Sequence, residues 1–405
     1  MSAIDELSSR KTWSDFLSQI KKNDDRKAIR KIESFVKEKK YLDTVKGIQN
    51  GSYQFSAPKR IEIPKPGTDK KRVIYTFKRD DCTEHLILRV FAKSLMKYDK
   101  HLAPNLYSFR SKRGVREAMS YLKGIEGLQH MYAYKADISQ YFNSIDTDIL
   151  FKKLKKEIDE DEFYLIEQIL MNPLVEQNGV ITRDTEKGIM PGLPFATYLS
   201  NFFLNDMDWY FHKKGIVYCR FADDIIVFSK TKEELKKHVA YIRGYMKRNN
   251  LVINRDKEYF YSPEDCIEFL GMKIHNGDFD LSDKSLNRML SKIRIEGRHY
   301  RKTVERKEKT VDDALHCMVT VLNRKLYGYE KNSKACWSYW YFPLVNTDRS
   351  LKIIDQYEQM YLRYVVTGRH NKGNVNKVPY RVLKKAGYVT LTNRYYARDS
   401  YISEP

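Results

Sequence analysis

Three aspartates at the ends of two expected strands are the residues of this chain best suited to chemistry. Asp223 and Asp224 stand between the apolar runs GIVYCR and IIVFS, a pattern that predicts a β-hairpin with an acidic turn. Adjacent carboxylates raise each other's pKa, so a chain normally keeps such a pair where a cation neutralises it. Asp137 ends a second run, MYAYKAD, which alternates as a strand does. Carboxylates on neighbouring strands can hold two magnesium ions about 4 Å apart, the arrangement used for in-line nucleotidyl transfer.

Basic residues in two further segments could bind phosphates. Lys65 and Arg72 flank a KPGTDKK turn, whose tight bend could fold an ammonium and a guanidinium onto a triphosphate. A solvated basic loop is the alternative for this segment. Further along, Lys284, Arg288 and Lys292 share one stripe of an expected helix. We expect that stripe to contact a nucleic-acid duplex, although a charged stripe can also be a solvated face.

Seven segments in this chain resemble, in order, the sequence motifs of reverse transcriptases. Two are similar to the fingers motifs and five to motifs A to E. They are IPKPGTDKKRVIYTFKRDDCTEHLILRVFAKSL (63–95), NLYSFRSKRGVREAMSYL (105–122), ADISQYF (136–142), GIMPGLPFATYLSN (188–201), YCRFADDIIVFS (218–229), LVINRDKEYF (251–260) and IEFLGMKI (267–274).

The resemblance implies a two-metal mechanism and a role for each matched residue. Asp137 and Asp223 would hold both Mg²⁺ ions, with Asp224 as a third metal-binding carboxylate in a supporting position. One ion would lower the pKa of the primer 3′-hydroxyl, and the other would neutralise the triphosphate and the leaving pyrophosphate. Lys257 has the position of the motif D lysine, a candidate general acid for the pyrophosphate, although a solvated lysine is the alternative. Arg110, in the second fingers segment, is expected to bind nucleic acid.

Two positions bear on the choice and handling of the nucleotide. Phe142 matches the residue that lies against the sugar of the incoming nucleotide, where a large aromatic ring excludes a 2′-hydroxyl. It therefore favours deoxynucleotides, the alternative being an ordinary core phenylalanine. Gly192 would permit close backbone approach to template or nucleotide. Pro191 stands where many reverse transcriptases have glutamine, so one polar contact of the family is absent from this sequence.

The resemblance also implies the fold class, an α+β right-hand polymerase fold with fingers, palm and helical thumb. The palm is expected to be ferredoxin-like, with an antiparallel sheet and helices. Hydrophobic spacing predicts a helical segment over the first 50 residues and helices after the last motif. The expected divisions are an N-terminal helical segment (1–50), fingers (51–136), palm (137–278), and a helical thumb with a C-terminal tail (279–405).

The composition favours a nucleic-acid partner in a reducing compartment. Lys and Arg number 74 against 53 Asp and Glu, a net charge of +21 that attracts phosphates. The five cysteines have no zinc-site spacing, and their odd number argues against a disulfide framework. The sequence has no long apolar run and no signal-peptide pattern at its start, so we expect a cytoplasmic protein without a membrane partner.

The tail VPYRVLKKAGYVTLTNRYYARDSY (378–401) resembles that of bacterial unknown-group reverse transcriptases that act in phage defence. Among these, the compact second defence-associated type is most similar to this chain. That resemblance implies a structured non-coding RNA as template, copied from deoxynucleoside triphosphates into cDNA. The alternatives are a retron-like or group II intron-derived enzyme, a non-catalytic RNA-binding polymerase fold, and an RNA-dependent RNA polymerase. The identity of the RNA, the priming mode, the oligomeric state and the activating trigger stay open.

Overall fold

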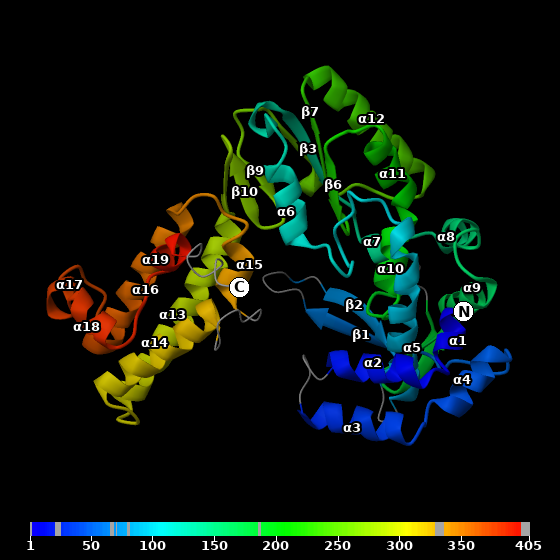
Figure 1. Ribbon diagram of the computed structural model, residues 1–405, viewed down its shortest axis with the longest axis horizontal. Coiled ribbons are helices and arrows are strands. Elements are labelled where there is room, and N and C mark those ends of the chain that lie inside the picture. The colour runs from blue at the N-terminus through cyan, green and yellow to red at the C-terminus, as the bar shows by residue number, and fades with distance from the viewer. Residues whose placement is uncertain are drawn as a thin grey trace. The chain divides into compact units, whose positions relative to one another are not determined.

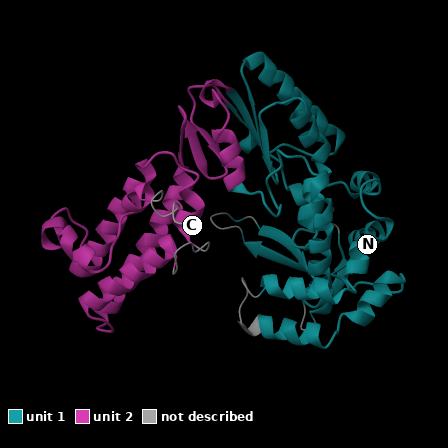
Figure 2. Ribbon diagram, viewed as in Figure 1, with its two compact units in different colours: residues 1–115, 132–260 teal, residues 116–131, 261–405 magenta. Residues whose placement is uncertain are grey.

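The computed structural model describes residues 2–20, 26–64, 69, 71–78, 82–184, 188–328 and 336–397. The chain divides into two compact units, each built from two stretches of sequence (Figure 2). The first unit contains residues 1–115 and 132–260, and the second contains 116–131 and 261–405. These divisions differ from the expected boundaries after 136 and 278, because residues 116–131 and the last sheet belong to the mainly helical second unit. Mixed helices and sheets confirm the predicted α+β class.

The first unit contains all the segments that were expected to carry catalytic carboxylates (Figure 1). Its elements up to residue 115 are α1 (Ala3–Glu6), α2 (Arg10–Ile20), α3 (Arg26–Lys37), α4 (Leu42–Gln49), β1 (Lys59–Pro64), β2 (Lys71–Thr76), α5 (Thr83–Ser94) and the 3₁₀ helix η1 (Leu95–His101). From residue 132 they are β3 (Tyr132–Asp137), α7 (Tyr141–Ser144), α8 (Thr147–Leu154), α9 (Glu160–Leu170), β4 (Leu174–Gln177), β5 (Val180–Arg183), α10 (Ala196–Phe203), α11 (Asn205–Lys213), β6 (Tyr218–Phe221), β7 (Asp224–Ser229), α12 (Lys232–Arg248), η3 (Arg255–Lys257) and β8 (Tyr259–Tyr261).

An antiparallel sheet with the order β6-β7-β3-β8 holds the candidate carboxylates. The hairpin that the sequence predicts around the acidic turn is present as β6 and β7. In the register between β3 and β7, Asp137 lies opposite Asp224. Helices α11 and α12 pack against this sheet (Figure 1). The apolar residues of β7, Ile225 to Phe228, are buried between them and the rest of the unit, which fixes the register of the hairpin.

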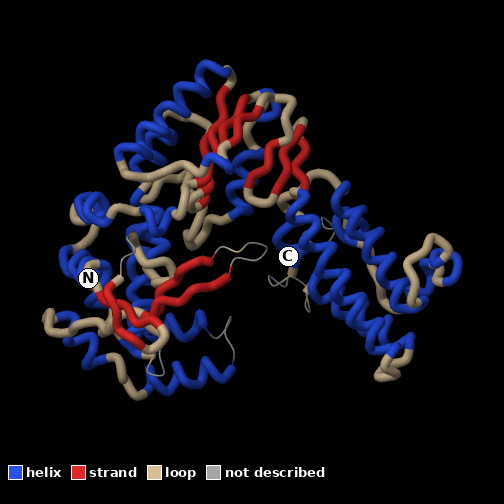
Figure 3. Tube along the Cα trace, turned by 180° about the vertical axis from the view of Figure 1, so that it is seen from behind, coloured by secondary structure: helices blue, strands red, loops and turns tan. Residues whose placement is uncertain are grey.

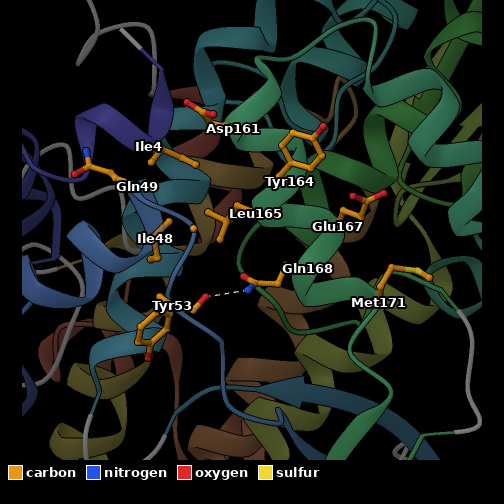
Figure 4. Close-up of a pocket in the computed structure, with 11 residues that line it drawn as sticks. Ile4, Ile48, Gln49, Tyr53, Asp161, Tyr164, Leu165, Glu167, Gln168 and Met171 are labelled. Atoms are coloured by element: carbon orange, nitrogen blue, oxygen red, sulfur yellow. Dashed lines mark hydrogen bonds between the residues drawn. The ribbon is translucent and has the colours of Figure 1, made fainter.

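A second sheet in the same unit has the order β2-β1-β4-β5 (Figure 3, red). The N-terminal helices share the hydrophobic core of the first unit, where the ring of Trp13 stacks on Tyr41 with centroids 4.2 Å apart. Between α1, α4 and α9 lies a cavity of about 630 Å³ (Figure 4). Ile4, Ile48 and Leu165 supply apolar lining, and Gln168 donates to the backbone oxygen of Tyr53 at 2.9 Å beside it. None of the predicted site residues lines this cavity.

The second unit consists of long helices that follow a small antiparallel sheet. Its elements are α6 (Val115–Lys123), η2 (Leu128–His130), β9 (Ile267–Phe269), β10 (Met272–His275), β11 (Asp278–Leu281), α13 (Asp283–Glu305), α14 (Val311–Tyr327), α15 (Trp337–Tyr341), α16 (Arg349–Thr367), α17 (Asn374–Lys377), α18 (Tyr380–Lys385) and α19 (Leu391–Tyr396). Ser282 caps the long helix α13 by accepting from the backbone N–H of Ser285. Helix α13 packs closely on α16 where Gly297 faces the ring of Tyr361, since a Cβ at residue 297 would lie 2.5 Å from that ring.

Contacts of α6 explain why it belongs to the second unit although its sequence lies within the expected fingers. Lys123 donates to the backbone oxygen of Pro343 at 2.9 Å and its ammonium lies 5.4 Å from the ring centroid of Phe279. The guanidinium of Arg116 lies over the ring of Tyr339. Among the described residues, no helix is both long enough and apolar enough to cross a bilayer.

Candidate active site

The three predicted carboxylates meet at one end of the β6-β7-β3 sheet. Asp137 is the last residue of β3 and is 7% exposed, while Asp223 and Asp224 are half-buried at the turn between β6 and β7. The backbone N–H of Ile138 donates to the oxygen of Asp223 at 3.3 Å, which ties the end of β3 to the turn. The structure therefore brings together residues that are separated by more than eighty positions in sequence.

Electrostatic repulsion within this cluster is visible at Asp223. Burial, followed by the charges of Asp137 and Asp224, raises the pKa of Asp223 to about 6, whereas Lys257 partly opposes the shift. Burial and nearby negative charges disfavour the ionised carboxylate, whereas a nearby positive charge favours it. The carboxylates therefore repel one another, and Lys257 offsets part of that repulsion at Asp223.

Lys257, the candidate general acid, contacts one of the carboxylates. Its ammonium donates to Oδ2 of Asp137 at 2.8 Å, from the end of η3. Burial lowers the pKa of Lys257, but the hydrogen bond to Asp137 and the charges of all three aspartates outweigh burial and raise it. The lysine side chain is 55% exposed, so the ammonium can move away from the carboxylate.

The donor set fits a hard divalent cation that shares its coordination with a substrate. Carboxylate oxygens are the ligands that Mg²⁺ prefers, and Mg²⁺ is commonly held by one or two carboxylates together with phosphates and water. Within the described ranges, no group of three or more His, Cys, Asp or Glu side chains is arranged to hold a metal ion by itself. Asp137 and Asp223 could therefore supply part of a coordination shell that water and triphosphate oxygens complete.

The backbone of Phe142 lies against a glycine that the sequence analysis did not single out. Phe142 lies in α7, half-buried, and its backbone oxygen accepts from the N–H of Ile189 at 2.9 Å. Gly188 has φ of +105°, and a Cβ there would overlap the same Phe142 oxygen. Only glycine combines this φ with such a close approach. The GIMPG string contained that signal, since a second glycine in the same segment, at its first position, indicates a tight backbone passage.

Pro191, which stands where many reverse transcriptases have glutamine, makes a backbone contact with β2. The backbone oxygen of Pro191 accepts from the N–H of Tyr75 on β2 at 2.7 Å. Gly192, with φ of +103°, brings its Cα so near β2 that a Cβ would lie 2.6 Å from the oxygen of Tyr75. The backbone of Gly192 thus lies close to β2 of this protein. Its predicted contact with template or nucleotide stays a prediction.

The two phosphate-binding candidates of the predicted fingers differ in what the structure describes. Arg72 lies on β2, exposed and opposite Ile63 of β1. Its contact with a nucleotide stays a prediction. Lys65 lies outside the described residues.

Arg110, which was predicted to bind nucleic acid, makes several hydrogen bonds within the first unit. Its side chain is 6% exposed and donates to both carboxylate oxygens of Asp99, from Nε at 2.8 Å and from Nη2 at 3.0 Å. Nη1 donates to the backbone oxygen of Ala103 at 2.7 Å. These bonds join Arg110 to η1 and to the segment that follows it. Its predicted contact with nucleic acid stays a prediction.

The predicted basic stripe lies on α13 in the second unit. Lys284, Arg288 and Lys292 are all exposed, while Met289 and Ile293 on the opposite side of the helix are buried. This arrangement leaves three cationic side chains available to phosphates. Whether they bind a duplex stays a prediction.

Sequence reasoning also missed a buried polar network behind the acidic turn. Arg220 and Asp208 are both fully buried and form an ion pair. An arginine between apolar residues in YCRF was the available signal, because a buried charge requires a partner. The partner could not be identified locally, since Asp208 lies on another element.

Comparisons with known proteins identify the family of this chain. The model of the family described as reverse transcriptase (RNA-dependent DNA polymerase) matches residues 63–274. Protein YkfC of Escherichia coli is 22% identical over 267 residues, which are 56% of this chain and 68% of YkfC. The putative enzymatic polyprotein of Cassava vein mosaic virus is 36% identical over 101 residues, 25% of this chain and 15% of the polyprotein.

Solved telomerase structures are similar at a low level. Telomerase from Candida tropicalis, truncated of its C-terminal domain, has a TM-score of 0.43 and 14% identity, covering 60% of this chain and 59% of that one. Telomerase from Candida albicans in complex with a fragment of telomeric RNA has a TM-score of 0.42 and 12% identity. The match covers 87% of this chain and 66% of the telomerase chain. Because these scores are low, the assignment depends on the family match, which spans more than half of the chain and contains all three carboxylates. This chain belongs to the reverse transcriptase (RNA-dependent DNA polymerase) family.

Proposed function

We propose that this protein is an RNA-directed DNA polymerase that uses Asp137 and Asp223 to bind two magnesium ions. The observation that carries the proposal is the cluster itself, in which Asp223 has its pKa raised to about 6 by burial and then by its two carboxylate neighbours. Such a cluster is costly unless a cation occupies it. When bound, the ions would activate the primer hydroxyl and neutralise the triphosphate. Asp224 would add its charge from the supporting position.

The remaining side chains would orient the nucleotide. Phe142, fixed by the backbone contact at Gly188, would lie against the sugar and exclude a 2′-hydroxyl. Arg72 and Lys65 would bind the triphosphate, and Lys257 would donate a proton to the pyrophosphate. The exposed stripe of Lys284, Arg288 and Lys292 would follow the backbone of the template–product duplex.

Substitution of the carboxylates tests the site. Asp137→Asn and Asp223→Asn should each lower nucleotide incorporation by roughly 10²-fold or more, since a bound metal stabilises several kcal/mol of developing charge. The matched control is Asp256→Asn, which removes an exposed carboxylate next to Lys257. Incorporation on a primed RNA template should survive in the control. Near-normal synthesis by either site variant would overturn the assignment.

We further infer that the template is a dedicated structured RNA and that the enzyme acts in bacterial phage defence. The support is the resemblance of the chain to the compact defence-associated reverse transcriptases, together with a net charge of +21. Sequencing of the RNA and cDNA that copurify with the protein from its host should give one dominant small RNA and DNA complementary to part of it. The plating efficiency of phage should fall on hosts that express the wild type but not on hosts that express Asp223→Asn. A heterogeneous RNA population without preference in competition at high salt would refute the dedicated template.

A further inference from the structure

The residue that precedes Asp223 has a backbone conformation that needs external support. Ala222 has φ of +57°, in the left-handed region that is strained for a residue with a Cβ. It is also 8% exposed, so water supports its backbone groups poorly. A turn of this kind retains one geometry only if surrounding groups hold it.

Two side chains bind the two backbone groups of Ala222. Its N–H donates to Oγ of Ser108 at 2.8 Å. Its carbonyl oxygen accepts from Nη1 of Arg220 at 3.0 Å. The peptide groups on both sides of the Ala222 Cα are thereby fixed, including the one that leads directly to Asp223.

Both side chains are themselves immobilised. Nε of Arg220 donates to Asp208 Oδ1 at 2.9 Å, and Nη2 donates to the backbone oxygen of Asn201 at 2.8 Å. Ser108 Oγ donates to Oδ1 of Asn201 at 2.9 Å, and Nδ2 of Asn201 donates back to the oxygen of Ser108 at 2.7 Å. Helices α10 and α11 thus hold the arginine and the serine, and through them the turn. We call Ser108 and Arg220 the turn clamp.

We propose that the turn clamp positions Asp223 for metal binding, so that Ser108 and Arg220 are positioning residues of the active site. A buried ion pair contributes little stability over an apolar pair of the same volume, whereas its directed hydrogen bonds specify one geometry. The inference rests on the proposed function in taking Asp223 as a metal ligand. It assigns to the clamp the arrangement of that ligand relative to Asp137.

The test uses the full-length protein and measures Mn²⁺ affinity directly, by electron paramagnetic resonance of the free ion. Ser108→Ala removes the acceptor of the Ala222 N–H. Arg220→Lys keeps a cation beside Asp208 but lacks the fork that also reaches Ala222. The control is Tyr218→Phe, which removes a buried 2.8 Å hydrogen bond to the same Asp208 without touching Ala222. Thermal unfolding of all four proteins reports the loss of stability separately from the loss of metal.

We expect both clamp variants to bind Mn²⁺ about tenfold more weakly, because each leaves a buried backbone group of the turn unsatisfied. The Mg²⁺ concentration for half-maximal activity should rise in parallel, whereas Tyr218→Phe should match the wild type in both despite a similar fall in unfolding temperature. Unchanged Mn²⁺ affinity in Ser108→Ala and Arg220→Lys would overturn the proposal, as would an equal loss in Tyr218→Phe. A wild type that binds Mn²⁺ but makes no DNA would refute the proposed function, while the effect of the clamp variants on Mn²⁺ affinity could still be measured.

Discussion

Replacing Lys257 by methionine should have opposite effects on metal affinity and on turnover. The substitution keeps an unbranched side chain of similar length but removes the ammonium that lies 2.8 Å from Asp137 Oδ2. That oxygen belongs to an expected metal ligand, so the ammonium and an arriving cation compete for it. The same ammonium is the expected proton donor to the pyrophosphate.

The size of the first effect follows from the exposure of the pair. With the lysine side chain 55% exposed, the ion pair contributes about 0.2–1 kcal/mol rather than the value of a buried bridge. Loss of the competitor should therefore tighten Mn²⁺ binding by no more than about fivefold. Loss of a general acid, in contrast, should lower the maximal rate by about 10²-fold or more. The two effects are distinguishable because they have opposite signs.

Two measurements on the same protein samples separate these effects. Mn²⁺ affinity is measured without nucleotide, and single-nucleotide incorporation is measured at saturating Mg²⁺. The control is Arg255→Met, which removes an exposed positive charge two residues away. Weaker Mn²⁺ binding by Lys257→Met than by the control would show that the ammonium supports the cluster instead of competing with metal. An unchanged maximal rate would rule out the general-acid role.

Three further perturbations test the nucleotide, the duplex and the second unit. Phe142→Ala should raise ribonucleotide incorporation relative to deoxynucleotides, and a wild type that already uses both equally would contradict the steric argument. Charge reversal at Lys284, Arg288 and Lys292 together should weaken duplex binding and lower the log–log salt slope by up to about three, while Mn²⁺ affinity is unchanged. Glu358 is fully buried, and burial followed by the Asp355 charge raises its pKa well above 4.5. Between pH 4.5 and its raised pKa, Glu358 keeps a proton in the folded protein that the unfolded chain loses, so its contribution to stability should fall by roughly 1.4 kcal/mol per pH unit in that window. In denaturant titrations, the stability of Glu358→Gln should therefore fall less steeply with pH than that of the wild type.

The carboxylates could be predicted because their signals are local. Two apolar runs around an acidic pair specify a hairpin, and alternation in MYAYKAD specifies a strand that ends at Asp137. The register that places Asp137 opposite Asp224 could not be obtained from either segment. It depends on which residues of β7 are buried beneath α11 and α12, and that burial is a property of the folded unit.

Two arginines show that residue type alone does not determine what a charged side chain contacts. Arg110 and Arg220 both carry a charge that suits phosphate, yet each is directed inward by partners that the local sequence does not reveal. Asp99 and backbone carbonyls surround the first, and Asp208 with Asn201 surrounds the second. Neither the spacing nor the composition of the YCRF and YSFR segments specifies these partners, because they lie on separate elements.

Arg220 and Lys257 act on the acidic turn in different ways. Arg220 is paired with Asp208, so it fixes the backbone of Ala222 while its charge is already balanced. Lys257 faces the carboxylates themselves and opposes the pKa shift of Asp223, but its exposed side chain can leave. The buried pair of Arg220 and Asp208 thus holds the backbone geometry of the turn, and the carboxylates keep negative charge when Lys257 moves away. A site arranged in this way holds its ligands in place before a divalent cation arrives and keeps the charge that attracts it.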